Sequence, residues 1–130
     1  MMKSLPHKIF NRCKRIPFNT TIYTTREKRD YTFCGIRDRR ITNESVLYSV
    51  PNNKSPQCPN IKGFQREEMD NLWYFLLTTK SLSIQDIESK YPALIKEGKC
   101  CFAAFYGLIN FLFPNQFTKS KSKINLKPNK

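Results

Sequence analysis

The sequence predicts a small α+β domain in which an antiparallel sheet of about three strands packs against three helices. The strands occupy the N-terminal half, where residues 18–50 are rich in β-branched and aromatic side chains. The helices occupy the C-terminal half, where apolar residues recur at every third or fourth position. A chain of 130 residues suits one such domain with a modest core.

Three strands are predicted in the N-terminal half. The segments FNTTIYTT (18–25) and DYTFCGI (30–36) favour extended structure, and the charged segment REKR between them predicts a turn. The third segment, SVLYSV (45–50), has the two-residue alternation of a strand. Residues 51–65 hold three Pro and one Gly, which predicts an irregular loop that crosses to the helical half.

Two amphipathic helices are predicted next. The first covers residues 66–79, and acids in its first turn, Asp70 among them, complement the helix dipole. A capping box of Ser83 and Asp86 opens the second helix, SIQDIESKY, which Pro92 is expected to end. The first helix has a core-facing stripe at positions i, i+3, i+4, i+7 and i+8, formed by Met69, Leu72, Trp73, Leu76 and Leu77.

The third predicted helix runs from Cys100 to Phe113 and has almost no polar side chain. As a helix, these fourteen residues would span about 21 Å, whereas the hydrocarbon core of a bilayer is roughly 30 Å thick. A helix that is apolar all round usually packs inside a protein. We therefore expect it at the centre of the core and expect no membrane partner, with a short membrane anchor as the alternative.

The net charge of +13 is concentrated at the two ends of the chain. Residues 1–40 carry a charge of +8, residues 41–117 are neutral, and residues 118–130 carry +5. This distribution is typical of a folded body with cationic arms. We expect a basic N-terminal arm over residues 1–17, a single α+β domain over residues 18–117, and a disordered Lys-rich tail over residues 118–130.

The five Cys and the N-terminal segment argue against a secreted protein. The Cys count is odd, no CxxC occurs, and the first residues contain no apolar signal region. We expect a cytoplasmic or organelle-interior location, with a targeting peptide within residues 1–26 as an open alternative. With His7 the only histidine, we expect no metal site and no cofactor, and the Cys are interpreted as small buried hydrophobic residues.

Few features indicate catalysis, so no catalytic residue is expected. The chain lacks a Gly-rich phosphate loop, and no convincing base for a nucleophile is present. The string DIESK places Asp86, Glu88 and Lys90 at the spacing of some metal-dependent nucleases, in which these residues lie on a strand. Because the Ser83 cap predicts a helix there, the three side chains should diverge, and a nuclease is kept only as an alternative.

The clustered cations predict binding to nucleic acid. Positive side chains at strand ends, with aromatic residues on the strands, could hold a phosphate backbone while rings stack on bases. We therefore expect a non-enzymatic accessory protein that binds RNA or DNA mainly through phosphate contacts. A module or inhibitor that docks its basic face on an acidic protein partner is the alternative. The expected binding residues are Arg12, Lys14, Arg15, Arg26, Arg29, Tyr31, Phe33, Arg37, Arg39 and Arg40.

Overall fold

The first sheet forms from consecutive strands in the N-terminal half, and most of the helices follow in the C-terminal half. The computed structural model describes residues 5–22, 31–39, 43–50, 60–95 and 100–127, with the backbone alone at 36–39, 43, 44, 60, 61 and 100. The described elements are α1 (Phe10–Cys13), β1 (Thr21–Ile22), β2 (Tyr31–Arg39), β3 (Asn43–Val50), β4 (Asn60–Gln65), α2 (Arg66–Thr79), β5 (Ser81–Ser83), α3 (Ile84–Lys90), α4 (Pro92–Ile95), α5 (Cys100–Leu112), β6 (Phe117–Lys119) and β7 (Lys123–Leu126).

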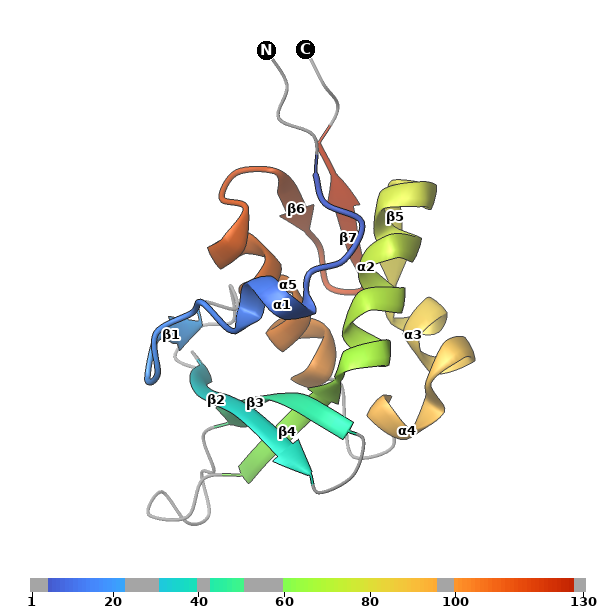
Figure 1. The fold of residues 1–130 in the computed structure, drawn as a ribbon. Helices are drawn as coiled ribbons and strands as arrows, with labels where there is room; N and C mark the ends of the chain where they lie inside the picture. The colour runs from blue at the N-terminus through green and yellow to red at the C-terminus, as the bar shows by residue number, and fades with distance from the viewer. Residues whose placement is uncertain (1–4, 23–30, 40–42, 51–59, 96–99, 128–130) are drawn as a thin grey trace.

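Two antiparallel sheets lie on opposite sides of α5 (Figure 1). The first sheet has the order β1-β2-β3-β4, and the second has the order β5-β7-β6. The predicted α+β class with antiparallel pairing is therefore confirmed, but the first sheet has four strands and not about three. The additional strand β4 lies within residues 51–65, where we expected only a loop. It pairs with β3 from Val50↔Asn60 to Ser45↔Gln65, and its buried Phe64 anchors it to the core.

The second sheet corrects the expectation for the C-terminal end. From Thr118 we expected a disordered tail, yet the chain forms β6 and β7 there. Phe117 and Ile124 are fully or nearly fully buried, and Leu82 of β5 pairs with Ile124. Two buried apolar residues and a partner strand are enough to order this Lys-rich segment, because the backbone hydrogen bonds do not depend on side-chain polarity.

The helices agree more closely with the prediction. The predicted range of α2 is confirmed, and its first turn carries a capping box in which the backbone N–H of Gln65 donates to Glu68 Oε1 over 2.8 Å. The capping box of Ser83 and Asp86 opens α3 as expected. The helix α3 ends at Lys90, before Pro92, as predicted. Pro92 is the first residue of the unforeseen helix α4, a position that tolerates proline because its missing N–H would have no partner there.

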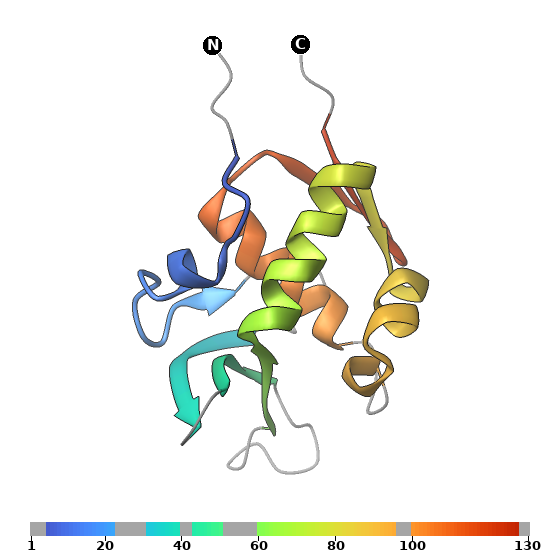
Figure 2. The same cartoon turned by 45° about the vertical axis from the view of Figure 1, so that its right-hand side comes forward.

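The central position predicted for α5 is confirmed (Figure 2). Phe102, Phe105, Leu108 and Ile109 are at most 2% exposed, and Leu112 is partly buried against the same core. Rings from three strands continue into this helix through Tyr31, Tyr48, Phe64 and Phe105, with successive centroids 5.6–6.0 Å apart. Among the helices in the described ranges, none combines the length and the apolar character needed to cross a bilayer.

Replacing Phe105 with Ala should lower the free energy of unfolding by about 3–5 kcal/mol, because a fully buried ring is replaced by a cavity. Urea unfolding followed by circular dichroism would measure the change. Phe111 lies on the same helix but is 44% exposed, so Phe111→Ala is a matched control that should cost less than about 1 kcal/mol. Equal effects of the two substitutions would contradict the central position of α5.

Candidate nucleic-acid interface

A buried carboxylate holds the start of α1 against α2. Asp70 Oδ1 accepts hydrogen bonds from the backbone N–H groups of Ile9 and Phe10, each over 2.9 Å. The first N–H groups of a helix have no partner within the helix, and the side chain of Ile9 at the N-cap supplies none. Asp70, about sixty positions later in the sequence, therefore supplies the acceptor that an N-cap side chain usually provides.

A second contact fixes the segment that precedes α1. The indole Nε1–H of Trp73 donates to the backbone carbonyl of Pro6 over 2.8 Å. The Trp73 ring is fully buried and stacks on Phe113, with a centroid separation of 5.3 Å, and its edge contacts Phe117. Since Trp73 lies one turn after Asp70 on α2, the two side chains hold residues 6–10 along one helix. The described part of the expected basic arm is thus an integral part of the fold.

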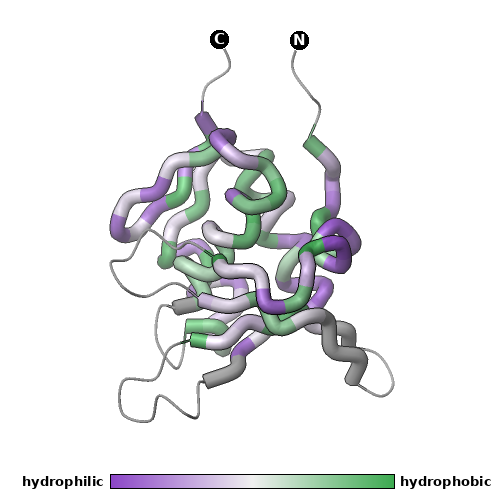
Figure 3. The backbone as a smooth tube through the Cα atoms, turned by 90° about the vertical axis from the view of Figure 1, so that its left-hand side faces the viewer, coloured by the Kyte–Doolittle hydropathy of each residue, from purple (hydrophilic) through white to green (hydrophobic). Residues whose placement is uncertain are grey.

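The segment around α1 separates apolar from charged side chains. Its apolar residues Ile9, Phe10, Cys13 and Ile16 are at most 5% exposed, whereas Arg12, Lys14 and Arg15 are exposed. Figure 3 shows the hydrophilic positions on the outside of this coil. The same helical turn that buries the apolar residues therefore directs three cations to the surface.

Three cations in and near this segment make cation–π contacts with aromatic rings. The guanidinium carbon of Arg66 lies 4.4 Å from the ring centroid of Phe10, and its Nη1 donates to Asn11 Oδ1 over 3.2 Å. The ammonium of Lys14 lies 5.8 Å from the same ring, and Arg12 lies 5.6 Å from the ring of Phe113. Such cation–π contacts hold a charge close to the face of the ring. We name Arg12, Lys14, Arg15 and Arg66 the α1 basic cluster.

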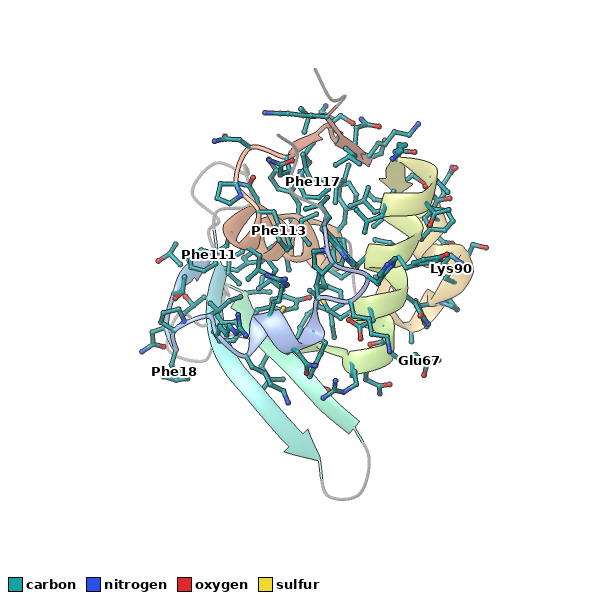
Figure 4. All side chains as sticks on the ribbon, turned by 45° about the horizontal axis from the view of Figure 1, so that its top comes forward. Phe18, Glu67, Lys90, Phe111, Phe113 and Phe117 are labelled. Carbon is teal, nitrogen blue, oxygen red and sulfur yellow. The ribbon has the colours of Figure 1, made fainter. Side chains whose placement is uncertain are left out.

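Carboxylates of α2 adjoin this cluster. Burial, and secondarily the negative charge of Asp70, raise the pKa of the Cys13 thiol to about 12. Burial also raises the pKa of Glu68, opposed by the hydrogen bond from the backbone of Gln65 and reinforced by the charge of Glu67. Glu67 is exposed at the start of α2, as the label in Figure 4 shows. The acidic side chains therefore mark the α2 border of the cluster.

The predicted cationic binding residues fall into three groups. Arg12, Lys14 and Arg15 are exposed within and directly after α1. Arg37 and Arg39 lie in β2, opposite Ser45 and Asn43 of β3. The structure describes the backbone of these two residues but not their side chains. The three further cations Arg26, Arg29 and Arg40 lie outside the described residues.

The two predicted stacking residues need a correction. Tyr31 and Phe33 are 1% and 2% exposed, and they face the core from β2. Tyr31 stacks on Tyr48 with a centroid separation of 5.8 Å, and that contact uses the ring face that a base would need. Because residues two apart on a strand share a face, both rings are buried by the same packing. They are therefore not available to bases.

Other cations were not among the predicted residues. Arg66 was not singled out, because in sequence it belongs to the acidic first turn of α2. The β6–β7 hairpin carries Lys119, Lys121 and Lys123, which the sequence assigned to a mobile tail. In Figure 2, α1 lies at the left and the β6–β7 hairpin at the upper right.

The geometry around α3 does not converge on a catalytic site. Asp86 is engaged in its capping box, and Glu88 and Lys90 line two different cavities. Within the described residues, no group of three or more His, Cys, Asp or Glu side chains could hold a metal ion. The α1 basic cluster is the arrangement with the clearest chemistry, since fixed cations can bind phosphate.

Comparison with known proteins finds no matching family model, no matching curated protein and no matching solved structure. The functional argument for this chain therefore rests on its own residues and their geometry.

Replacing Asp70 with Ala should destabilise the protein by at least about 1–3 kcal/mol, because two buried backbone N–H groups lose their acceptor. Asp70→Asn keeps an acceptor oxygen and should cost less. Glu67→Ala, an exposed acid on the same turn, is the control and should change stability by no more than about 0.5 kcal/mol. Thermal or urea unfolding gives the values, and an Asp70→Ala protein as stable as the control would refute the capping role.

Cys13 should resist alkylation by iodoacetamide in the native protein at pH 8. Its thiol is buried with a raised pKa, and the thiolate is the reactive form. Cys34 is only partly buried and should react faster. Mass spectrometry of the digested protein would resolve the two sites, with urea-unfolded protein as the fully labelled reference. Labelling of native Cys13 at the rate of Cys34 would mean that α1 is not docked as described.

Proposed function

We propose that this chain is a small non-enzymatic protein that binds nucleic acid, and that the α1 basic cluster contacts the phosphate backbone. The observation that carries the proposal is the presence of three exposed cations within four residues, on a segment that Asp70 and Trp73 fix in place. A phosphate backbone is the regularly spaced polyanion that such a surface fits.

The fixed position of these cations supports binding over simple solvation of the surface. A mobile Lys or Arg loses side-chain entropy when it binds, at about 0.5–1.5 kcal/mol per residue. Arg12, Lys14 and Arg66 are already restrained on rings, so part of that loss occurs on folding. Arginine also presents a planar fork of donors that matches two phosphate oxygens. The cluster is therefore suited to phosphate both in charge and in geometry.

The proposal also includes the predicted cations Arg37, Arg39 and Arg40. Arg37 and Arg39 belong to β2, which pairs with β1, the strand that follows α1. If these residues and Arg40 join Arg12, Lys14 and Arg15, about six phosphates would be neutralised, and log K against log[salt] would slope near −5 on duplex DNA or near −4 on a single strand. Fluorescence anisotropy at several salt concentrations would measure the slope.

Reversing two charges of the cluster tests its location. Arg12→Glu combined with Arg15→Glu should weaken binding and flatten the salt slope by about 2, because two phosphate contacts are lost. Lys121→Glu combined with Lys123→Glu makes the same change in net charge at the β6–β7 hairpin. This control should weaken binding much less.

Two results would count against the proposal. Equal effects of the two double variants would show that net charge acts without a defined surface. Absence of binding to RNA and DNA at low salt, with retention of the protein on an acidic protein or peptide column, would instead support the alternative of a basic face that docks on an acidic partner.

A further inference from the structure

We propose that Phe18 is a base-stacking residue and that the ligand of the α1 basic cluster is a single-stranded nucleic acid. This inference rests on the proposed function and specifies its substrate class. Phe18 is 69% exposed, more than Tyr74 at 56% or Phe111 at 44%, the other large hydrophobic residues exposed in the described part of the chain. One exposed ring is common on protein surfaces, so the argument depends on how this ring is held and on what surrounds it.

A tight turn presents Phe18 at its tip. The carbonyl of Pro17 accepts hydrogen bonds from Thr20, from the backbone N–H over 3.2 Å and from Oγ1 over 2.6 Å. Asn19 has a φ of +68°, the left-handed conformation that a type II turn needs at its third position. Phe18 therefore occupies the second position of this turn, and Pro17 at the first position restricts the chain that leads into it.

Backbone hydrogen bonds attach this turn to the first sheet. The N–H of Asn19 donates to the carbonyl of Phe33 over 2.9 Å, and the N–H of Phe33 donates to the carbonyl of Thr20 over 2.8 Å. Both bonds are made by the two residues that directly follow Phe18, and they tie this side of the turn to β2. A ring with such support loses little conformational entropy when a ligand binds.

Strand β2 lets the Phe18 ring come close to its backbone. Between Phe33 and Ile36, the pairing of β2 with β3 shifts register, and Gly35 there has a φ of +87°. A Cβ atom built on Gly35 would lie 3.6 Å from Phe18 Cδ2, so the edge of the ring rests against the strand at a residue without a side chain. The ring is thus supported on one side and open on the other.

The charge around the ring fits a polyanion. Arg12, Lys14 and Arg15 precede Phe18 by three to six residues, and consecutive backbone turns connect them, from Arg15 N–H to the carbonyl of Arg12 and from Ile16 N–H to the carbonyl of Cys13. No acid occurs in the sequence before Glu27. A cationic surface beside an exposed aromatic ring is the arrangement that binds single strands, with phosphates on the cations and a base on the ring.

A single strand suits this ring better than a duplex. In a duplex, each base face is already covered by its neighbours, and a protein ring can stack only if it separates two base pairs. Single strands offer uncovered base faces. Phe18 should therefore contribute to the binding of a single strand and contribute little to the binding of a duplex.

The test compares a labelled oligothymidylate with a labelled duplex of the same length, by fluorescence anisotropy on the full chain. Phe18→Ala should weaken binding of the single strand by about 5-fold to 150-fold, the range expected for one lost base stack. Duplex binding should change less than about 2-fold, and Phe18→Trp should keep the binding of the single strand. Phe18 is mostly exposed, so these variants should fold, which circular dichroism can check.

Tyr74→Ala is the matched control. Tyr74 is also exposed, but it lines a cavity of about 440 Å³ together with Lys90 of α3. Figure 4 shows Lys90 on the side of the molecule opposite to Phe18. The control should bind the oligothymidylate like the unaltered chain. Equal losses in Tyr74→Ala and Phe18→Ala would overturn the assignment of the stacking surface.

Three other outcomes separate this inference from the proposed function. If the unaltered chain binds both oligonucleotides and Phe18→Ala binds as tightly, the stacking role is wrong and phosphate binding stands. If the unaltered chain binds neither oligonucleotide and no RNA at low salt, both proposals fail. If it binds neither but binds vesicles that contain phosphatidylserine, and Phe18→Ala loses that binding, the ring inserts into a lipid surface and the nucleic-acid inference is overturned.

Discussion

Two hydrogen bonds from the backbone of Ile9 and Phe10 to one carboxylate determine where the N-terminal segment lies. A helix of four residues such as α1 is too short to form by itself, because nucleation costs more than its few hydrogen bonds return. Asp70 supplies the missing acceptor, and Trp73 one turn later binds the carbonyl of Pro6. With α1 docked, its apolar residues are buried, and the cations between them are therefore exposed to solvent.

Burying Asp70 is costly, and the surrounding residues show how the cost is offset. An ionised carboxylate away from water needs hydrogen bonds and positive charge nearby. The two N–H groups provide such hydrogen bonds. Lys14 and Arg66 both lie over the ring of Phe10, the residue that donates one of these bonds. These contacts with Phe10 restrain the two cations for a ligand.

Short-range patterns in the sequence predicted the elements that depend mainly on residues close to one another in the chain. Apolar periodicity and capping residues predicted α2 and α3, and an unbroken apolar run predicted α5, whereas the short helices α1 and α4 were not predicted. The strands β4, β6 and β7 were not predicted, because each depends on one or two buried side chains and on a partner strand distant in sequence. The same limit applies to the site. Alternation shows that Tyr31 and Phe33 share a face but not that this face is buried, and the partner of Asp70 lies sixty positions away.

Hydrogen exchange at the amides of Ile9 and Phe10, followed by NMR, tests most directly whether the cations are carried by a docked segment or by a mobile arm. A docked segment predicts protection of both amides close to that of the buried α2 residues Trp73 and Leu76, since these N–H groups are released only when the contact with Asp70 breaks. Exchange at the rate of an unstructured peptide, while α2 stays protected, would contradict the fixed cationic surface on which the functional argument depends.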